Sequence, residues 1–171
     1  EDEAALKRQL SDIEVTIGYE NGAQQVFLNG ENVTGLIRTE QVSDMTSRSS
    51  AKPQVREKLT ELQRTLAKKE DVLMDGRDIG TMILPDAQLK IFLTASVKTR
   101  AERRYKEQIE KGESCTLEEI ERDIEERDYR DSHRETAPLR QAEDAVLVDS
   151  SFMNIDEVVA AILGIYKDKV E

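Results

Sequence analysis

Hydrophobic and polar residues alternate near the start of the chain. From 13 to 19 every second residue is hydrophobic, which is typical of a β-strand with one covered face. Asn-Gly pairs follow at 21–22 and 29–30, and this dipeptide favours the two-residue turns of β-hairpins. The pattern predicts a short acidic helix over 1–10 and then a three-stranded meander within 12–35.

Helical spacing replaces this alternation from Pro53 onward. Val55, Leu59, Leu62 and Leu66 recur at intervals of four, three and four residues, so they share one face of an α-helix. Proline suits the first turn of a helix because its missing N–H is not needed there. We predict a helix that begins at Pro53 and ends shortly after Leu66.

Short apolar runs alternate with helical patterns in the second half of the chain. Strands are predicted at 71–74, 89–93 and 145–148. Helices are predicted after Ser96, after Thr116 with its capping-box partner Glu119, and from Asn154 onward. Strands that alternate with helices are typical of a parallel sheet, so the sequence predicts the α/β class.

Composition narrows the possible partners. The chain of 171 residues has 25 basic and 36 acidic residues, a formal charge of −11, and a single cysteine, Cys115. A protein this acidic repels polyanions, which argues against nonspecific binding to nucleic acid or to an anionic membrane. No apolar run approaches the roughly 18 residues of a spanning helix, and no leader pattern is present. We expect a soluble protein of the reducing cytoplasm.

One candidate site follows directly on the predicted strand at 71–74. Residues 75–80 read Asp-Gly-Arg-Asp-Ile-Gly. Ligands bind at the carboxyl ends of the strands of an open parallel sheet, so Arg77 and Asp78 are placed for chemistry. The alternative is a surface turn in which Arg77 and Asp78 pair only with each other.

A second candidate is a row of charged residues late in a predicted helix. Arg127, Asp131 and Arg134 stand at i, i+4 and i+7 and share one helical face, and Arg130 lies among them. Guanidinium groups bind phosphate oxygens through paired hydrogen bonds. Eight of the fourteen arginines lie between 100 and 140, which favours an anionic ligand. The alternative is a solvated helix with exposed ion pairs, each contributing less than about 1 kcal/mol.

A third candidate precedes the helix that begins at Pro53. Ser47 and Arg56, with the polar residues 48–50 between them, could recognise the carbonyl edges of a nucleobase. They could equally form an N-cap and a solvated turn, and both alternatives stay open. His133 has no nucleophile or metal-ligand pattern around it, and we interpret it as a surface residue.

Four motifs between residues 75 and 132 resemble those of a known family. They are Asp75-Gly76-Arg77-Asp78-Ile79-Gly80-Thr81, Leu84-Pro85-Asp86-Ala87, Arg100-Ala101-Glu102-Arg103-Arg104 and Glu126-Arg127-Asp128-Tyr129-Arg130-Asp131-Ser132. Together they resemble the bacterial cytidylate kinases, which phosphorylate CMP and dCMP with ATP. The resemblance runs nearly end to end and in the expected order, which makes it more specific than any single motif.

The resemblance implies a P-loop nucleoside monophosphate kinase fold, a three-layer α/β/α structure around a parallel sheet. It places a CMP-binding insert at 1–68, the sheet core at 69–103 and 141–171, and a helical lid at 104–140. The sequence contains no phosphate-binding loop of the form G-x-x-x-x-G-K-[ST]. We therefore expect the family's first strand, P-loop and first helix to lie outside this chain.

The resemblance also implies roles for single residues. The implied substrate-binding residues are Ser47, Arg56, Arg77, Asp78 and Asp131. The implied catalytic residues are Arg127, Arg130 and Arg134, which would neutralise charge between the donor and acceptor phosphates. Cytosine would be read by Ser47, Arg56 and Asp78, the CMP phosphate would be bound by Arg77, and the ribose by Asp131. The lid would hinge at Arg103 and Arg104.

The implied reaction is in-line transfer of the γ-phosphoryl group from ATP, with Mg²⁺, to CMP or dCMP by a monomer, with no metal ligands in this chain. Without a P-loop we expect the chain alone to bind CMP weakly and to form little or no CDP. One alternative is a noncatalytic CMP-binding fragment of such a kinase. The other is an acidic helical interaction module, whose arginine rows would be solvated ion pairs.

Overall fold

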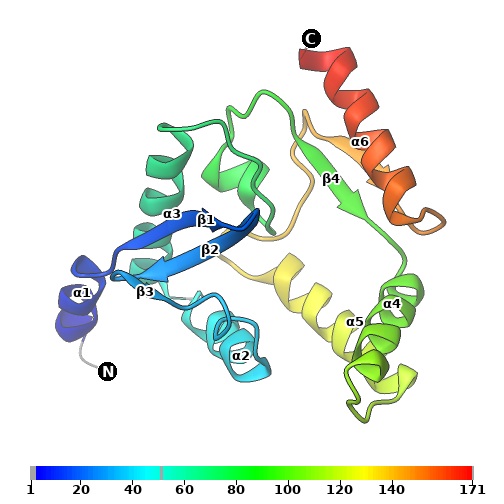
Figure 1. The fold of residues 1–171 in the computed structure, drawn as a ribbon, viewed down its shortest axis with the longest axis horizontal. Coiled ribbons are helices and arrows are strands. Elements are labelled where there is room, and N and C mark those ends of the chain that lie inside the picture. The colour runs from blue at the N-terminus through cyan, green and yellow to red at the C-terminus, as the bar shows by residue number, and fades with distance from the viewer. Residues whose placement is uncertain (1–2, 51, 171) are drawn as a thin grey trace. The chain divides into compact units, whose positions relative to one another are not determined.

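The computed structural model describes residues 3–50 and 52–170, and the side chains of some helical residues, Ser47 among them, lie outside the description. The chain divides into an N-terminal unit, Glu1–Leu73, and a C-terminal unit, Met74–Glu171. Each unit has a sheet of its own. Figure 1 shows the elements of both units along the chain.

The N-terminal unit contains the predicted meander. Strands β1 (Val15–Glu20), β2 (Ala23–Leu28) and β3 (Glu31–Asn32) form an antiparallel sheet in the order β1-β2-β3. The register pairs Val15 with Leu28 and Ile17 with Val26, so the alternating hydrophobic positions of β1 meet hydrophobic partners. The prediction of three short strands is confirmed.

Both turns of the meander have the backbone that Asn-Gly favours. Asn21 and Gly22 have φ angles of 51° and 77°, and Asn29 and Gly30 have φ angles of 49° and 84°. A type I′ turn requires a positive φ at both central residues, because its twist then matches the twist of the two strands. The two dipeptides therefore set the register of the sheet.

The helices of the N-terminal unit are α1 (Glu3–Ser11), α2 (Glu40–Ser49) and α3 (Pro53–Ala67). The predictions of the first and third are confirmed, with Pro53 in the first turn of α3. Helix α2 is not predicted from the sequence, because its segment has few hydrophobic positions. Its local signal is the N-cap Thr39, whose hydroxyl accepts a hydrogen bond from the Val42 amide at 3.2 Å.

The C-terminal unit contains a parallel pair of strands. Strand β4 (Ile91–Thr94) pairs with β5 (Val146–Asp149) in register from Ile91 with Val146 to Thr94 with Asp149. Two helices lie between these strands in the sequence, and α6 (Ile155–Val170) follows β5. The predicted strands at 89–93 and 145–148 and the predicted α/β class are confirmed.

The prediction of a strand at 71–74 is wrong. In the described part of the chain these residues join no sheet, and β4 and β5 pair only with each other. A strand needs a neighbour for its backbone N–H and C=O groups and a cover for its apolar side chains. Leu73 is instead fully exposed, at 100 %. An apolar run is therefore not sufficient to form a strand when no neighbouring strand in the described part of the chain pairs with it.

The two helices between β4 and β5 pack against each other. Helix α4 (Val97–Glu110) starts at the N-cap Ser96, and α5 (Leu117–His133) starts with the predicted capping box of Thr116 and Glu119. Buried Ala101 of α4 and buried Ile120 and Ile124 of α5 form the core between them. Figure 1 shows the two helices side by side. The expected boundary of the lid between 103 and 104 falls inside α4.

A π-helical turn, η1 (Ile79–Ile83), follows the charged motif at 75–78 and is not predicted from the sequence. The Ile83 amide donates to the Asp78 carbonyl at 3.3 Å, and the Leu84 amide donates to the Ile79 carbonyl at 2.8 Å. Both bonds span five residues, as in a π-helix. Such turns are frequent at functional sites, and this one fixes the backbone of Asp78.

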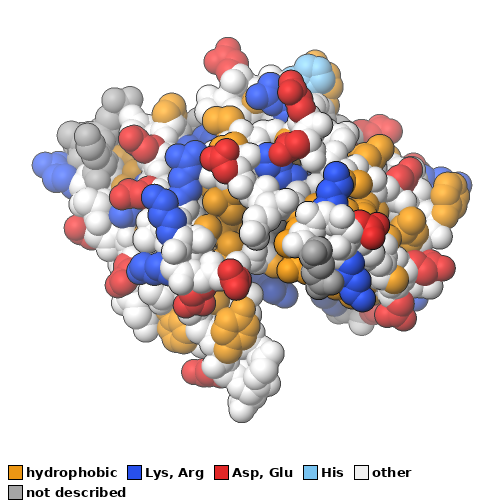
Figure 2. All heavy atoms as spheres, turned by 90° about the horizontal axis from the view of Figure 1, so that it is seen from above, with side chains coloured by type: hydrophobic (Ala, Val, Ile, Leu, Met, Phe, Trp, Pro, Cys, Tyr) orange, Lys and Arg blue, Asp and Glu red, His pale blue; other side chains and the backbone are white. Residues whose placement is uncertain are grey.

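Side chains of both charges cover much of the face drawn in Figure 2, with hydrophobic side chains between them. Several large hydrophobic residues are exposed, and Phe152 is 99 % exposed. No helix within the described ranges combines the length and apolar character that crossing a bilayer requires.

Gly30 provides a test of the turn geometry. Its φ of 84° lies in the left-handed region, where a Cβ is strained, although no described atom lies within 4 Å of that Cβ. Gly35 has the same open space without a left-handed φ. We expect Gly30→Ala to lower the free energy of unfolding by about 1 kcal/mol, and Gly35→Ala to leave it unchanged or slightly higher. Urea denaturation measures both values, and equal effects would contradict the turn assignment.

Candidate functional site

Three arginines surround the carboxylate of Asp131. The Nε atoms of Arg77 and Arg127 lie 3.5 and 3.9 Å from Oδ2 of Asp131, and Nη1 of Arg134 lies 3.8 Å from Oδ1. The Asp131 side chain is only 17 % exposed. We call these four residues the arginine cluster. The structure thus brings together four of the residues named from the sequence.

Two elements supply the cluster. Arg127 and Asp131 lie in the last turns of α5, and Arg134 is its C-cap, so the helix presents them at i, i+4 and i+7 as the spacing predicts. Arg77 comes from the loop before η1. The capping box and the buried face of α5 fix the helix, and its register then places the charged side chains. The ion pairs of the cluster are partly solvated, because the Asp131 side chain is 17 % exposed and the Arg127 side chain is 51 % exposed.

The distances in the cluster are ion-pair distances and exceed those of hydrogen bonds. A charge-assisted N–H···O bond is about 2.7–2.9 Å long, whereas the contacts to Asp131 are 3.5–3.9 Å. Within the described residues, Oδ2 of Asp131 is buried and has no hydrogen-bond partner. The cluster therefore holds an acceptor and several N–H donors that an incoming ligand can use.

Arg103, and in part Arg134 of the cluster, donate hydrogen bonds to backbone carbonyls of the protein. Nη2 of Arg103 donates to the carbonyls of Ser150 and Met153 at 2.6 and 3.0 Å. Nε of Arg134 donates to the Ala137 carbonyl at 2.6 Å, and this bond restrains the guanidinium group while its Nη1 faces Asp131. The Arg103 bonds connect α4 to the segment after β5, at the position where the hinge is expected.

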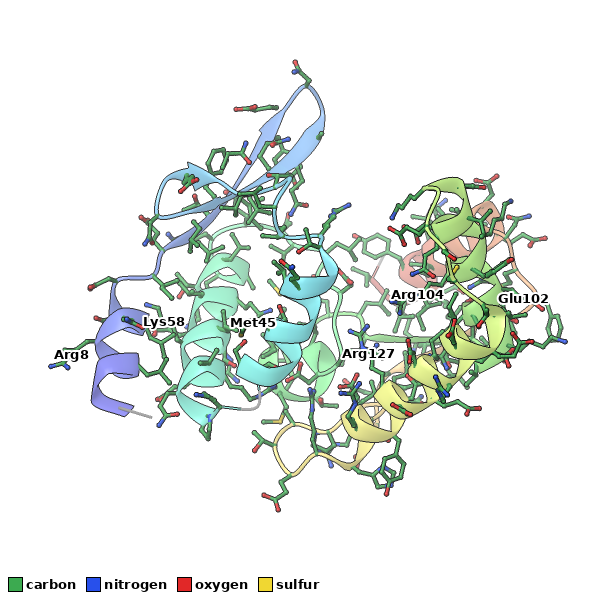
Figure 3. All side chains as sticks on the ribbon, turned by 90° about the horizontal axis from the view of Figure 1, so that it is seen from below. Arg8, Met45, Lys58, Glu102, Arg104 and Arg127 are labelled. Atoms are coloured by element: carbon green, nitrogen blue, oxygen red, sulfur yellow. The ribbon has the colours of Figure 1, made fainter. Side chains whose placement is uncertain are left out.

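Like charges surround Arg127. Burial lowers the pKa of its guanidinium most, the positive charge of Arg77 lowers that pKa further, and the charge of Asp131 opposes both. Arg104 and Arg130 lower the pKa as well, and Figure 3 labels Arg104 on α4 and Arg127 on α5. Arginine still keeps its proton at neutral pH. The cluster is therefore a concentration of positive charge in a chain of net charge −11, which favours an anionic ligand.

The other residues named from the sequence are placed as follows. Asp78 begins η1, and its carbonyl accepts from the Met82 amide at 2.9 Å. Arg130 is on α5, and its Nε donates to the Glu126 carbonyl at 3.4 Å. Arg56 and Ser47 belong to the N-terminal unit, on α3 and α2, and the Ser47 side chain lies outside the described residues. Ser47 is therefore within a helix, and the N-cap alternative for it is wrong.

Two residues of the site were missed as functional candidates. Asp128 of α5 lies 3.8 Å from Nη1 of Arg77 through its Oδ1, and Arg100 of α4 binds both carboxylate oxygens of Asp128. Asp128 stands three residues before Asp131, on the same side of the helix, and this i, i+3 spacing was the available signal. Arg100 lies in one of the motifs that carry the resemblance, but no signal in the sequence indicated its pairing with Asp128, which lies 28 residues away.

His133 and Cys115 both make contacts within the protein. His133 stacks on Tyr129 with ring centroids 4.0 Å apart, and its Nδ1 lies 2.9 Å from the Tyr129 carbonyl, in agreement with a surface role. Cys115 is a free, half-buried thiol packed against the core between α4 and α5. Among the described side chains, no group of three or more His, Cys, Asp and Glu could hold a metal ion.

Comparison with known proteins gives one consistent family. A family model described as cytidylate kinase matches residues 1–168. A cytidylate kinase of Ligilactobacillus salivarius is 49 % identical over 169 residues, which are 99 % of this chain and 75 % of the relative. A cytidylate kinase of Carboxydothermus hydrogenoformans is 48 % identical over 96 % of this chain and 74 % of its own length. One of Streptococcus pneumoniae is 54 % identical over 84 % of this chain and 64 % of its own length.

Asp131→Asn tests the electrostatics of the cluster. The amide keeps the shape of the side chain and removes the negative charge that offsets the mutual repulsion of the three arginines. We expect the variant to lose about 1 kcal/mol of stability at low salt, and less at high salt because the Debye length falls from about 10 Å at 0.1 M to 3 Å at 1 M. Thermal melts in 20 mM and 500 mM NaCl measure the loss. Glu143→Gln, an exposed carboxylate, is the control for net charge, and a loss independent of salt would contradict the electrostatic account.

Proposed function

The chain belongs to the cytidylate kinase family, and we propose that its arginine cluster carries the transfer of the γ-phosphoryl group of ATP to CMP or dCMP. The products are CDP or dCDP and ADP. The family has the P-loop nucleoside monophosphate kinase fold, in agreement with the parallel pairing of β4 and β5.

The observation that carries this proposal is the convergence of three guanidinium groups on one partly buried carboxylate, whose buried Oδ2 has no hydrogen-bond partner within the described residues. Phosphoryl transfer needs little covalent chemistry from the protein, and positioning and charge neutralisation supply most of the catalysis. Arg127 and Arg134 are assigned to the phosphoryl group in transfer, and Arg130 adds positive charge from the same helix. Arg77 is assigned to the phosphate of CMP.

Asp131 has two roles in this proposal. Without a nucleotide, its charge compensates that of the arginines around it. With a nucleotide bound, its buried Oδ2 accepts a hydrogen bond from a ribose hydroxyl, which satisfies an oxygen that has no partner within the described residues. The arginines can then turn their N–H groups to the phosphate oxygens.

Base recognition is assigned to Asp78, whose backbone is fixed by η1. Its carboxylate accepts a hydrogen bond from the exocyclic amine of cytosine, where uracil would present an oxygen. Ser47 and Arg56 are each proposed to meet an acceptor of the cytosine ring, O2 or N3. These two assignments rest on the motif resemblance alone.

The wider organisation follows the same family pattern. We assign 1–68 to CMP binding, 69–103 and 141–171 to the sheet core, and 104–140 to a lid, in a monomer of the cytoplasm. Mg²⁺ enters such reactions bound to the phosphates of ATP. The described side chains include no metal-binding group, and the roles above are those of the chain's own residues.

The proposed reaction is tested by CDP formation from CMP and ATP in the full-length protein that carries this sequence. We expect Arg134→Ala to lower kcat by about 10³-fold, because a lid arginine is needed most where charge develops between the phosphates. The KM for CMP should change little. Arg122→Ala, an exposed arginine of the same helix, is the control. No CDP from the folded wild-type protein would refute the proposal, and a raised KM with normal kcat would make Arg134 a substrate clamp.

Asp78→Asn tests base selection. Two acceptor oxygens in contact cost roughly 1–3 kcal/mol, so UMP should be at least about fivefold poorer than CMP as a substrate of the wild type. The amide of asparagine can rotate and donate to uracil, so the ratio of kcat/KM for CMP to that for UMP should fall, mainly through poorer use of CMP. Steady-state kinetics with both nucleotides measures the ratio. An unchanged ratio, with both activities reduced equally, would eliminate the base-reading role.

A further inference from the structure

Arg100 is an arginine whose nitrogen atoms are all engaged with the protein. It lies in the first turns of α4, and its Nε donates to the Ala95 carbonyl, just after β4, at 3.0 Å. Nη1 and Nη2 donate to Oδ1 and Oδ2 of Asp128 at 3.1 and 2.6 Å. This bidentate pair, about one-third exposed on each side, fixes Asp128 of α5 to the end of the strand.

Asp128 also faces Arg77. Its Oδ1 lies 3.8 Å from Nη1 of Arg77, and Oδ2 of Asp131 lies 3.5 Å from Nε of the same guanidinium. The two carboxylates stand three residues apart on α5 and hold Arg77 at two of its nitrogens. Neither distance is that of a hydrogen bond, so the orientation of Arg77 is set by charge while its N–H groups remain available to a ligand.

A carboxylate beside a phosphate-binding arginine creates a conflict. It attracts the guanidinium, and it also competes with the phosphate for the same N–H donors. In this structure the bidentate hydrogen bonds from Arg100 fix the position of the Asp128 carboxylate, and at that position its Oδ1 lies 3.8 Å from Nη1 of Arg77. Without Arg100 the carboxylate would be free to approach Arg77 to the length of a charge-assisted hydrogen bond, about 2.8 Å.

We propose that Arg100 and Asp128 are positioning residues for the transfer reaction. Asp128 orients the guanidinium of Arg77 toward the phosphate of CMP, and Arg100 restrains Asp128 so that it does not bind Arg77 itself. This rests on the proposed function of Arg77. The two residues act through Arg77 and have no contact with the substrate in this account.

Arg100→Ala should affect the acceptor nucleotide selectively. In the full-length protein, we expect the KM for CMP to rise about tenfold, the equivalent of one hydrogen bond to a charged group. The KM for ATP should be unchanged. The matched control is Lys111→Ala, which breaks the exposed ion pair of Lys111 with Glu107 on the same helix and should change neither KM. Equal rises in both KM values for Arg100→Ala would overturn the proposal.

The double variant Arg100→Ala/Asp128→Ala separates restraint from structural support. Removal of the released carboxylate ends its competition for Arg77, and only the orienting effect of Asp128 is then missing. The KM for CMP should therefore return to within about threefold of the wild-type value, a non-additive result. A merely structural role makes the double variant at least as impaired as Arg100→Ala, and that result would overturn the proposal.

Should Arg100→Ala not fold, Arg100→Lys keeps the charge but cannot hold both oxygens of Asp128. It should raise only the KM for CMP, and an unchanged value would also overturn the proposal.

Arg77→Ala distinguishes failure of this inference from failure of the proposed function. If Arg77→Ala leaves the KM for CMP unchanged, Arg77 does not bind the phosphate, and both proposals for it fail. If Arg77→Ala raises the KM for CMP but the double variant shows no recovery, Arg77 keeps its role and only the positioning role of Arg100 and Asp128 is refuted.

Discussion

The carboxylate of Asp131 makes the arrangement around the end of α5 possible. Three guanidinium groups cannot gather on their own, because like charges repel most strongly where water is partly excluded. A single, partly buried carboxylate between Arg77, Arg127 and Arg134 offsets this repulsion. It does so at ion-pair distances, so the arginines are held near one another without the loss of their N–H donors. The negative charge of Asp131 thus balances part of the positive charge of the arginines and leaves N–H groups of Arg77 and Arg127 without a hydrogen bond to it.

The placement of Asp131 depends in turn on how α5 is built. Thr116 and Glu119 cap the first turn reciprocally and so fix where the helix begins. Ile120 and Ile124 then bury one face of the helix against Ala101 of α4. With the start and the buried face both fixed, the angular position of every later residue follows from the helical repeat of 3.6 residues. A capping box some fifteen residues upstream thereby helps to orient Asp131.

Features set by neighbouring residues were predictable from the sequence, and features set by distant partners were not. The Asn-Gly turns, the capping box of α5 and the charged face shared by Arg127, Asp131 and Arg134 are local, and the structure contains all of them. A strand at 71–74 required a partner that no pattern within the run could reveal. The roles of Arg100 and Asp128 were missed because their pairing joins positions 28 residues apart. Local patterns therefore predicted the helix that carries the site, and the charge network depends on tertiary structure.

The hydrogen bonds of the arginines divide these residues into two groups, those that hold the structure together and those that can bind a ligand. The number of arginines in the sequence does not distinguish the two groups. Arg100 and Arg103 donate hydrogen bonds to backbone carbonyls, and Arg100 also donates to one carboxylate, so both residues connect secondary-structure elements. Arg77 and Arg127 face carboxylates only at ion-pair distance. A guanidinium already bonded at every nitrogen must lose a protein partner before it can bind phosphate, whereas one held only by charge exchanges one anion for another. The second kind is suited to a substrate that must bind, react and leave in each catalytic cycle.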